Sequence, residues 1–201
     1  MKTIPLYAPV YGVDHPCGRT TSILINRQTQ RVTHLVVKEV PASRVERLVP
    51  IEAVKKTSPA AVHLRCSRDE FSRMEPFVEI DSRTEMIPDY ENAAGVAWMT
   101  PYVPLRQVRI ETRSKKIPCG DVALQHGVRV QASDGSMGIV TGLRVEPASK
   151  RVKRLVVEPS LPLAHEQIVV PITLIERAEE NIIFLRLDKH SLKPRLATRP
   201  T

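Results

Sequence analysis

The chain has 201 residues, a formal net charge of +8, 4% aromatic residues, and 17 prolines against 8 glycines. Few aromatic residues and many Val and Ile favour short strands joined by stiff loops and argue against a helical bundle. No apolar run approaches the roughly 18 residues of a membrane span, and the N-terminus lacks the apolar core of a signal peptide. A soluble cytoplasmic protein without integral membrane insertion is therefore expected.

The basic surplus belongs to the two ends of the chain. Counting Lys and Arg against Asp and Glu, residues 1–77 hold 12 against 7, residues 78–125 hold 6 against 7, and residues 126–201 hold 12 against 8. Such a surplus is compatible with RNA, anionic lipid or an acidic protein partner. The 3 cysteines form no CxxC pair, which favours reduced thiols in a reducing compartment.

One strand pattern occurs twice, and this repeat organises the chain. Arg31–Val37 reads RVTHLVV and Arg151–Val157 reads RVKRLVV, so the two copies are offset by 151 − 31 = 120 residues. Each copy is about 70 residues long, near the lower limit for an independent core. We expect a first domain at residues 1–77, a connector packed between the domains at residues 78–125, and a second domain at residues 126–201.

The first copy is expected to begin with a proline-rich edge strand within residues 1–19. An alternating strand, a polar turn at Asn26–Gln30 and the RVTHLVV run then predict a β-hairpin. A polar loop leads to a short strand that ends at Pro50 and to a closing strand at Val62–Cys66. Ser67 lies three residues before a glutamate, the spacing of a capping box, so a short helical turn should follow.

The second copy repeats this order, with a turn at Glu146–Lys150, a strand ending at Pro171, a closing strand at Ile183–Leu187 and a helical turn capped by Asp188. The connector differs from both copies. It holds the only tryptophan, Trp98, together with Tyr102, in an otherwise polar segment, and then a basic and apolar alternation over Leu105–Lys116 that predicts one extended strand. Either the aromatic segment packs between the two domains, which we favour, or it is an exposed docking stretch.

No motif of a catalytic class is present: GxSxG, HExxH, the P-loop and GxGxxG are all missing from the sequence. The 6 histidines are scattered, without a second ligand three or four residues away. Asp14 and Asp134 recur at the same repeat position, and an Asx turn is favoured over a shared metal or substrate carboxylate. We therefore predict no catalytic residue, no metal site, no cofactor and no enzymatic activity.

The candidate partner contacts lie in the repeated runs and in the connector. Arg31 and Arg151 begin the repeated strand, and two interpretations stay open: a matched pair of anion contacts, or solvated strand ends. The full candidate set is Arg31, Arg151, Lys153 and Arg154 from the runs, with Trp98 and Tyr102 from the connector.

The order of these elements resembles the PRC-barrel family. A glycine where a strand begins, a turn, an RV(T/K)xLVV run, a polar loop, VPI and a closing strand before a capped turn occur twice, over about residues 5–77 and 126–195. The resemblance implies an all-β protein of two small PRC-like β-barrels in tandem, each ending in a short helical turn. Relatives include the cytoplasmic domain of the photosynthetic reaction-centre H subunit and the C-terminal domain of a ribosome-maturation factor, and both use the barrel as a binding surface.

The expected function is a non-catalytic adaptor or scaffold that binds a protein partner, with a membrane or photosynthetic complex as the setting that the resemblance suggests. The alternative is an RNA- or ribosome-binding module that uses the basic barrel faces. The sequence predicts neither the partner's identity nor whether the protein is a homo-oligomer.

Overall fold

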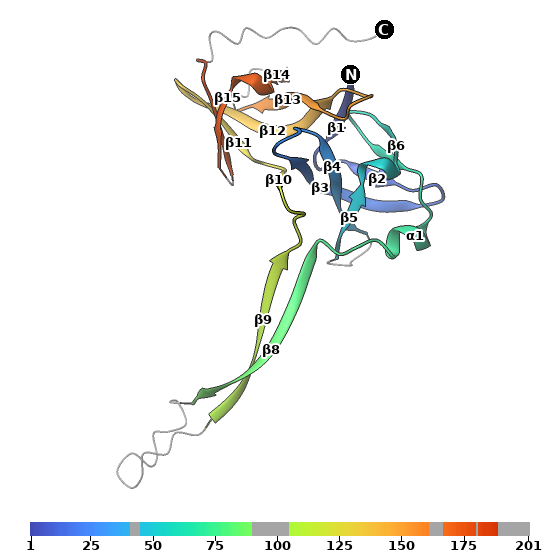
Figure 1. The fold of residues 1–201 in the computed structure, drawn as a ribbon, viewed down its shortest axis with the longest axis vertical. Coiled ribbons are helices and arrows are strands. Elements are labelled where there is room, and N and C mark those ends of the chain that lie inside the picture. Colours follow the sequence, from blue (N-terminus) through green and yellow to red (C-terminus); the bar gives the residue numbers. More distant parts are fainter. Residues whose placement is uncertain (41–44, 90–104, 161–166, 180, 189–201) are drawn as a thin grey trace. The chain divides into compact units, whose positions relative to one another are not determined.

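A computed structural model of the chain describes residues 1–40, 45–89, 105–160, 167–179 and 181–188 (Figure 1). These residues confirm the all-β class: they form strands β1 to β16, one short α-helix and two 3-10 turns. The strands belong to two seven-stranded sheets and one two-stranded ribbon.

The first sheet holds the first copy of the repeat, with strand order β5-β4-β3-β2-β7-β6. The RVTHLVV run forms most of β4, which pairs with β3 through the predicted hairpin. The hairpin turn closes at Gln30, whose φ of 55° is left-handed, and the Gln30 amide donates to the Asn26 carbonyl over 2.8 Å. The bounds are β2 (Pro9–Tyr11), β3 (Pro16–Asn26), β4 (Val32–Glu39), β5 (Glu46–Pro50), β6 (Val54–Thr57) and β7 (Val62–Leu64).

The second sheet has the same order one repeat later, β14-β13-β12-β11-β16-β15. Its hairpin turn closes at Lys150, also at φ 55°, and the Lys150 amide donates to Glu146 over 2.9 Å. Both VPI motifs end a strand at the proline, as predicted, and both prolines lead into a 3-10 turn. The bounds are β11 (Arg129–Ala132), β12 (Gly135–Val145), β13 (Val152–Pro159), β14 (Ile168–Pro171), β15 (Ile175–Ala178) and β16 (Ile182–Leu185), with 3-10 turns η1 (Ile51–Ala53) and η3 (Ile172–Leu174).

Each sheet is completed by a strand from the other half of the chain. Strand β1 (Lys2–Pro5) pairs with β12 of the second copy, whereas β10 (Asp121–Gln125) pairs with β3 of the first copy. The two pairings have the same register: Lys2 lies opposite Val145, and Val122 lies opposite Ile25. Because 122 − 2 and 145 − 25 both equal 120, β1 and β10 are equivalent strands of the repeat that have been exchanged.

The chain crosses from one sheet to the other at two equivalent residues. Tyr7 follows β1 and has a φ of 60°, while Gly127 follows β10 and has a φ of 86°. Thr21 and Thr141 mark equivalent positions on β3 and β12: the His126 amide donates to the Thr21 carbonyl, and the Leu6 amide donates to the Thr141 carbonyl. A left-handed residue thus lies at each crossing, where the chain changes direction, and the exchange is reciprocal.

The buried side chains of the two copies form one hydrophobic cluster. The cluster includes Leu35 and Val37 of β4 and their equivalents Leu155 and Val157 of β13, all with exposed fractions of 2% or less. Ile4 of the exchanged strand belongs to the same cluster. The exchange thus joins residues 1–77 and 117–201 into a single compact unit, and the segment 117–125, expected in the connector, contributes β10 to it.

The predicted helical turn of the first copy is confirmed. Helix α1 (Arg68–Ser72) begins after Ser67, whose hydroxyl accepts from the Glu70 amide while the Glu70 carboxylate accepts from the Ser67 amide. This capping box satisfies two of the amides that a helix start leaves unpaired. Phe71 of the helix is buried in the hydrophobic cluster. The turn expected after Asp188 lies outside the described residues.

Residues Val78–Lys116 form a second unit, an antiparallel ribbon. The predicted strand is confirmed as β9 (Leu105–Lys115), and its partner β8 (Val78–Pro88) was not predicted. The two strands make eleven cross-strand pairs, from Val78 opposite Lys115 to Pro88 opposite Leu105 (Figure 1). Trp98 and Tyr102 lie outside the described residues, so their packing stays a prediction. Among the described helices, none has the length and apolar character that crossing a membrane requires.

Candidate functional site

The two repeated arginines meet where the copies join. Arg31 and Arg151 form an antiparallel bridge between the two hairpins. On either side of the bridge, the Val32 amide donates to the Lys150 carbonyl over 3.1 Å and the Val152 amide donates to the Gln30 carbonyl over 2.9 Å. Since 152 − 32 and 150 − 30 both equal 120, the contact is reciprocal, like that of a two-fold symmetric dimer.

Four cations gather at this contact, and we call Arg31, Lys150, Arg151 and Lys153 the junction cluster. The side chains of both arginines and of Lys153 are exposed. The Arg151 side chain crosses the contact, because its Nε donates to the Thr29 carbonyl over 3.1 Å. The Lys150 Nζ also links the two copies, through an ion pair with the carboxylate of Glu52.

Two carboxylates partly balance the junction cluster. The hydrogen bond from Lys150 lowers the pKa of the Glu52 carboxyl, and the hydrogen bond from Ser149, followed by the charge of Lys153, lowers the pKa of Glu146. Lys153 Nζ lies 3.8 Å from the Glu146 carboxylate, a distance too long for a strong hydrogen bond. Four cations face two carboxylates, so the cluster keeps a net positive charge.

Arg154, the remaining predicted cation, extends this surface along the second sheet. It lies directly opposite Arg144 on the neighbouring strand, and both side chains are half-buried. Like charges placed opposite each other across a sheet are destabilising, and an anion between them would relieve the repulsion. The equivalent pair in the first copy is Leu24 and His34, so this extension belongs to the second copy alone.

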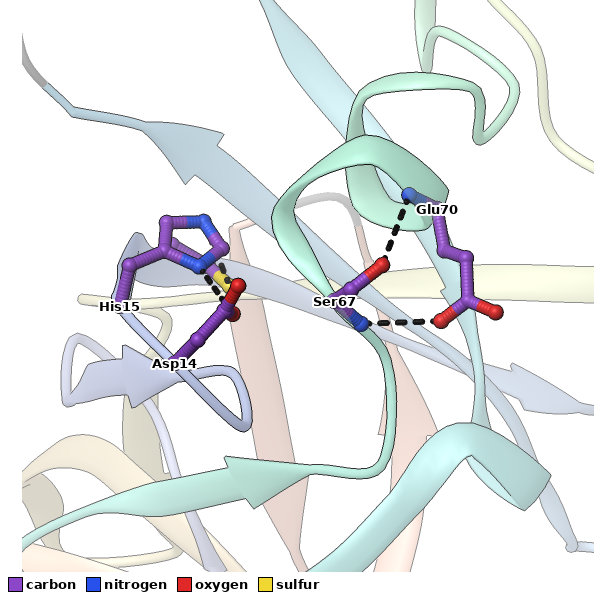
Figure 2. Close-up of polar contacts among 5 residues, drawn as sticks. Asp14, His15, Ser67 and Glu70 are labelled. Carbon is purple, nitrogen blue, oxygen red and sulfur yellow. Dashed lines mark hydrogen bonds and ion pairs between the residues drawn. The ribbon is translucent and has the colours of Figure 1, made fainter.

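A second group of polar side chains lies between β2 and β3 and was not predicted. Figure 2 shows the Asp14 carboxylate pointing at the imidazole of His15, with Asp14 Oδ1 2.8 Å from His15 Nδ1. On the other side of the ring, His15 Nε2 lies 3.8 Å from the sulfur of Cys17. Acid, imidazole and thiol therefore stand in the order that cysteine nucleophiles use.

The thiol, however, is not activated. Burial, followed by the nearby Cys66, raises the pKa of Cys17 to about 11, and only 1% of the residue is exposed. The thiol therefore stays protonated at neutral pH, whereas a nucleophile needs the thiolate. The hydrogen bond from His15 lowers the pKa of Asp14, so this side of the group is an ion pair or charge-assisted hydrogen bond.

His15 and Cys17 of this group line a cavity of about 120 Å³ between the β2–β3 turn and helix α1. The volume holds a few water molecules and is small for an organic substrate. In the second copy, Gly135 and Met137 take the places of His15 and Cys17, so the imidazole and the thiol belong to the first copy alone. The lining residues are His15, Pro16, Cys17, Glu39, Val40, Arg68 and Phe71.

The string Asp-His-Pro-Cys at residues 14–17 is the sequence signal for this group, but the sequence prediction favours an Asx turn for Asp14 and does not link it to His15 and Cys17. Among the described side chains, no group of three or more His, Cys, Asp or Glu residues is arranged to hold a metal ion. Of the six predicted contacts, the structure sets Arg31 opposite Arg151, places Lys153 of β13 beside Glu146 and Arg154 of β13 opposite Arg144, and does not describe Trp98 and Tyr102. No protein-family model and no curated protein matches the chain.

Proposed function

We propose that the chain is a tandem PRC-barrel protein and acts as a non-catalytic adaptor, whose junction cluster binds an acidic segment of a protein partner. The observation that carries this proposal is the bridge between Arg31 and Arg151, which sets two exposed arginines directly opposite each other. The repeat supplies both arginines, and the contact between the two hairpins brings them together.

The chemistry of the junction cluster favours carboxylates as ligands. A guanidinium is planar and binds a carboxylate with two parallel hydrogen bonds, and its weak hydration makes it suitable for an interface. A peptide with several Asp or Glu residues would meet Arg31, Arg151 and Lys153 in turn. Complementary charge of this kind fixes the register of a partner and accelerates its association. The resemblance to the PRC-barrel family suggests a partner in a membrane or photosynthetic complex.

An RNA-binding role is the second candidate, and exposed aromatic rings favour it. Tyr11 stacks on His63 with ring centroids 5.5 Å apart, and the Arg19 guanidinium lies 5.2 Å from the centroid of the Tyr7 ring. Both tyrosines are exposed, at 40% and 55%. Single-stranded RNA is bound by such rings together with basic side chains that contact phosphates.

Fluorescence anisotropy separates the two candidates. A labelled peptide of alternating Glu and Gly and a labelled single-stranded RNA are titrated with the wild-type protein and with Arg31→Glu/Arg151→Glu. We expect the peptide to bind the wild type and to lose affinity roughly tenfold or more with this variant, since two charge-assisted contacts become repulsive. The matched control is Lys55→Glu/Lys56→Glu, which reverses two exposed cations on β6.

If the control variant lost as much affinity for the peptide as the junction variant, the peptide would be responding only to the net charge of the protein. That result would contradict a binding site at the junction cluster. Binding of the RNA but not of the peptide, with loss on Tyr7→Ala/Tyr11→Ala, would establish the second candidate instead.

A further inference from the structure

We propose that two copies of the chain associate through the outer edge of β9, in an antiparallel pairing centred on Ile110, so that two ribbons form one four-stranded sheet. The proposal concerns the second unit alone and does not depend on what the junction cluster binds. It rests on the exposure of the ribbon, on the length of β9 and on the charges along its two strands.

The ribbon lacks the partners that an isolated pair of strands needs. Two-stranded hairpins are marginally stable in water, and three or more strands are usually required. Every residue of β9 except Val108 is exposed, and its large apolar residues Leu105 and Ile110 are exposed by 58% and 40%. Within the described residues, β8 is the only strand that pairs with β9, so the other edge of β9 presents unpaired backbone groups. A second strand on this edge would pair those groups.

The length of β9 selects one register for a symmetric pair. β9 runs from Leu105 to Lys115, and (105 + 115)/2 = 110, so pairing over its full length places the two-fold axis at Ile110. Arg109 of each copy then lies directly opposite Glu111 of the other copy, and this attraction occurs twice. Arg113 meets Gln107, Arg106 meets Ser114, and Lys115 meets Leu105, so no two like charges lie opposite each other.

Neighbouring symmetric registers lose this complementarity. An axis at Arg109 places the two Arg109 side chains opposite each other, and an axis at Glu111 does the same for the two glutamates. An axis midway between two residues is not possible, because opposite residues of an antiparallel pair point to the same face whereas consecutive residues point to opposite faces. Hydrogen bonding and charge therefore favour the same register.

The other edge of the ribbon disfavours self-association. Full-length pairing of β8 with a second β8 has its axis at (78 + 88)/2 = 83. Arg83 would then face Arg83 of the second copy, and Asp81 would face Glu85 twice, so all three charged contacts of these residues are repulsive. Pro88 also lacks an amide hydrogen. A dimer through β9 is closed, because the β8 edges left outside repel one another.

Charge reversal tests this register directly. In a dimer of Arg109→Glu, the new glutamate of each copy faces Glu111 of the other copy. In a dimer of Glu111→Arg, the new arginine of each copy faces Arg109 of the other copy, so each variant has two repulsive contacts. Within one ribbon, Arg109 pairs with Thr84 and Glu111 pairs with Ser82, so neither change breaks a direct cross-strand ion pair. Sedimentation velocity over a concentration series should show a dimer for the wild type, and each single variant should dimerise roughly thirtyfold more weakly.

Mixing the two single variants provides a control that a folding defect cannot imitate. The Arg109→Glu variant has glutamate at both positions 109 and 111, and the Glu111→Arg variant has arginine at both. Because position 109 of one copy lies opposite position 111 of the other, every glutamate in a mixed dimer faces an arginine. The mixture should therefore dimerise as the wild type does, and the double variant Arg109→Glu/Glu111→Arg should dimerise too. The matched control Arg83→Glu reverses a charge on the outer strand, keeps the β8 edges mutually repulsive, and should leave the dimer intact. A monomeric wild type, or single variants that fail to recover on mixing, would overturn the proposal.

Discussion

Two equivalent glycines offer a sensitive measure of how tightly the repeated hairpins are packed. A Cβ atom added to Gly18 would lie 1.9 Å from the Lys38 carbonyl oxygen, and a Cβ added to Gly138 would lie 1.9 Å from the Glu158 carbonyl oxygen. Both oxygens belong to the backbone of the neighbouring strand, which cannot rotate away as a side chain can. Relief to 3.0 Å, the closest tolerable contact, requires the strands to separate by 3.0 − 1.9 = 1.1 Å.

A separation of that size breaks the ladder hydrogen bonds next to the clash. Two backbone hydrogen bonds lost at about 1 kcal/mol each, with about 1–3 kcal/mol of steric strain, give roughly 3–5 kcal/mol for Gly18→Ala or Gly138→Ala. Gly127→Ala is the matched control, because Gly127 has a φ of +86° but no atom within 4 Å of its Cβ position. Gly127→Ala should lower the free energy of unfolding by only about 1–2 kcal/mol, the cost of placing alanine in a left-handed backbone conformation.

The assay is urea unfolding followed by circular dichroism, with the free energy of unfolding extrapolated to water for each variant. Equal costs at Gly18 and Gly138 are expected, because the two hairpins have the same geometry. If Gly18→Ala and Gly138→Ala lowered the free energy of unfolding no more than Gly127→Ala does, the two strands of each hairpin could not approach as closely as described.

Three further predictions concern the core, the thiols and the carboxylates. Val36→Ala and Val156→Ala should each lower the free energy of unfolding by about 1–2 kcal/mol, because both side chains are at most 3% exposed, and a negligible change at either would contradict the burial. In a native thiol titration with an aromatic disulfide reagent, only Cys119 should react quickly, because the other two cysteines are buried; three fast thiols would contradict this. The pKa values of Glu52 and Glu146 are lowered in the fold, so their contribution to stability is present above the ordinary carboxyl pKa of about 4 and is lost as pH falls through the lowered values. The melting temperature of Glu52→Gln/Glu146→Gln should thus fall less than that of the wild type between pH 5 and pH 3, and parallel curves would contradict the prediction.

The strands that the sequence predicted are those whose own residues carry the signal. The RVTHLVV and RVKRLVV runs became β4 and β13, because β-branched residues that are buried on both faces leave little choice of structure. Pro50 and Pro171 end their strands for a local reason too, since proline cannot donate to the ladder. The capping box at Ser67 is also a local signal, and the helix begins there.

The features that were not predicted depend on contacts between distant residues. Strand β1 and strand β10 have no distinctive pattern, and only their partners in the opposite copy reveal that they have been exchanged. Strand β8 carries no strand pattern in the sequence, because a ribbon exposed on both faces has no apolar side to alternate with a polar one. Arg31 and Arg151 are equivalent residues of the repeat, but their contact in space depends on how the two hairpins meet.

The strand exchange links the two copies into one compact unit with a shared core, so it is the central feature of the fold. Disulfide trapping in the intact chain tests it most directly. Thr3 on β1 lies opposite Arg144 on β12, whereas without exchange Thr3 would lie opposite Leu24 on β3, since 144 − 120 = 24.

Cross-strand partners are close enough for a disulfide, and mass spectrometry of proteolytic fragments identifies which one forms. Under mild oxidation we expect an intramolecular disulfide in Thr3→Cys/Arg144→Cys, with the monomer mass retained under denaturing conditions, and none in Thr3→Cys/Leu24→Cys. Efficient trapping in the second variant and not in the first would show that β1 remains with its own repeat and would contradict the exchange.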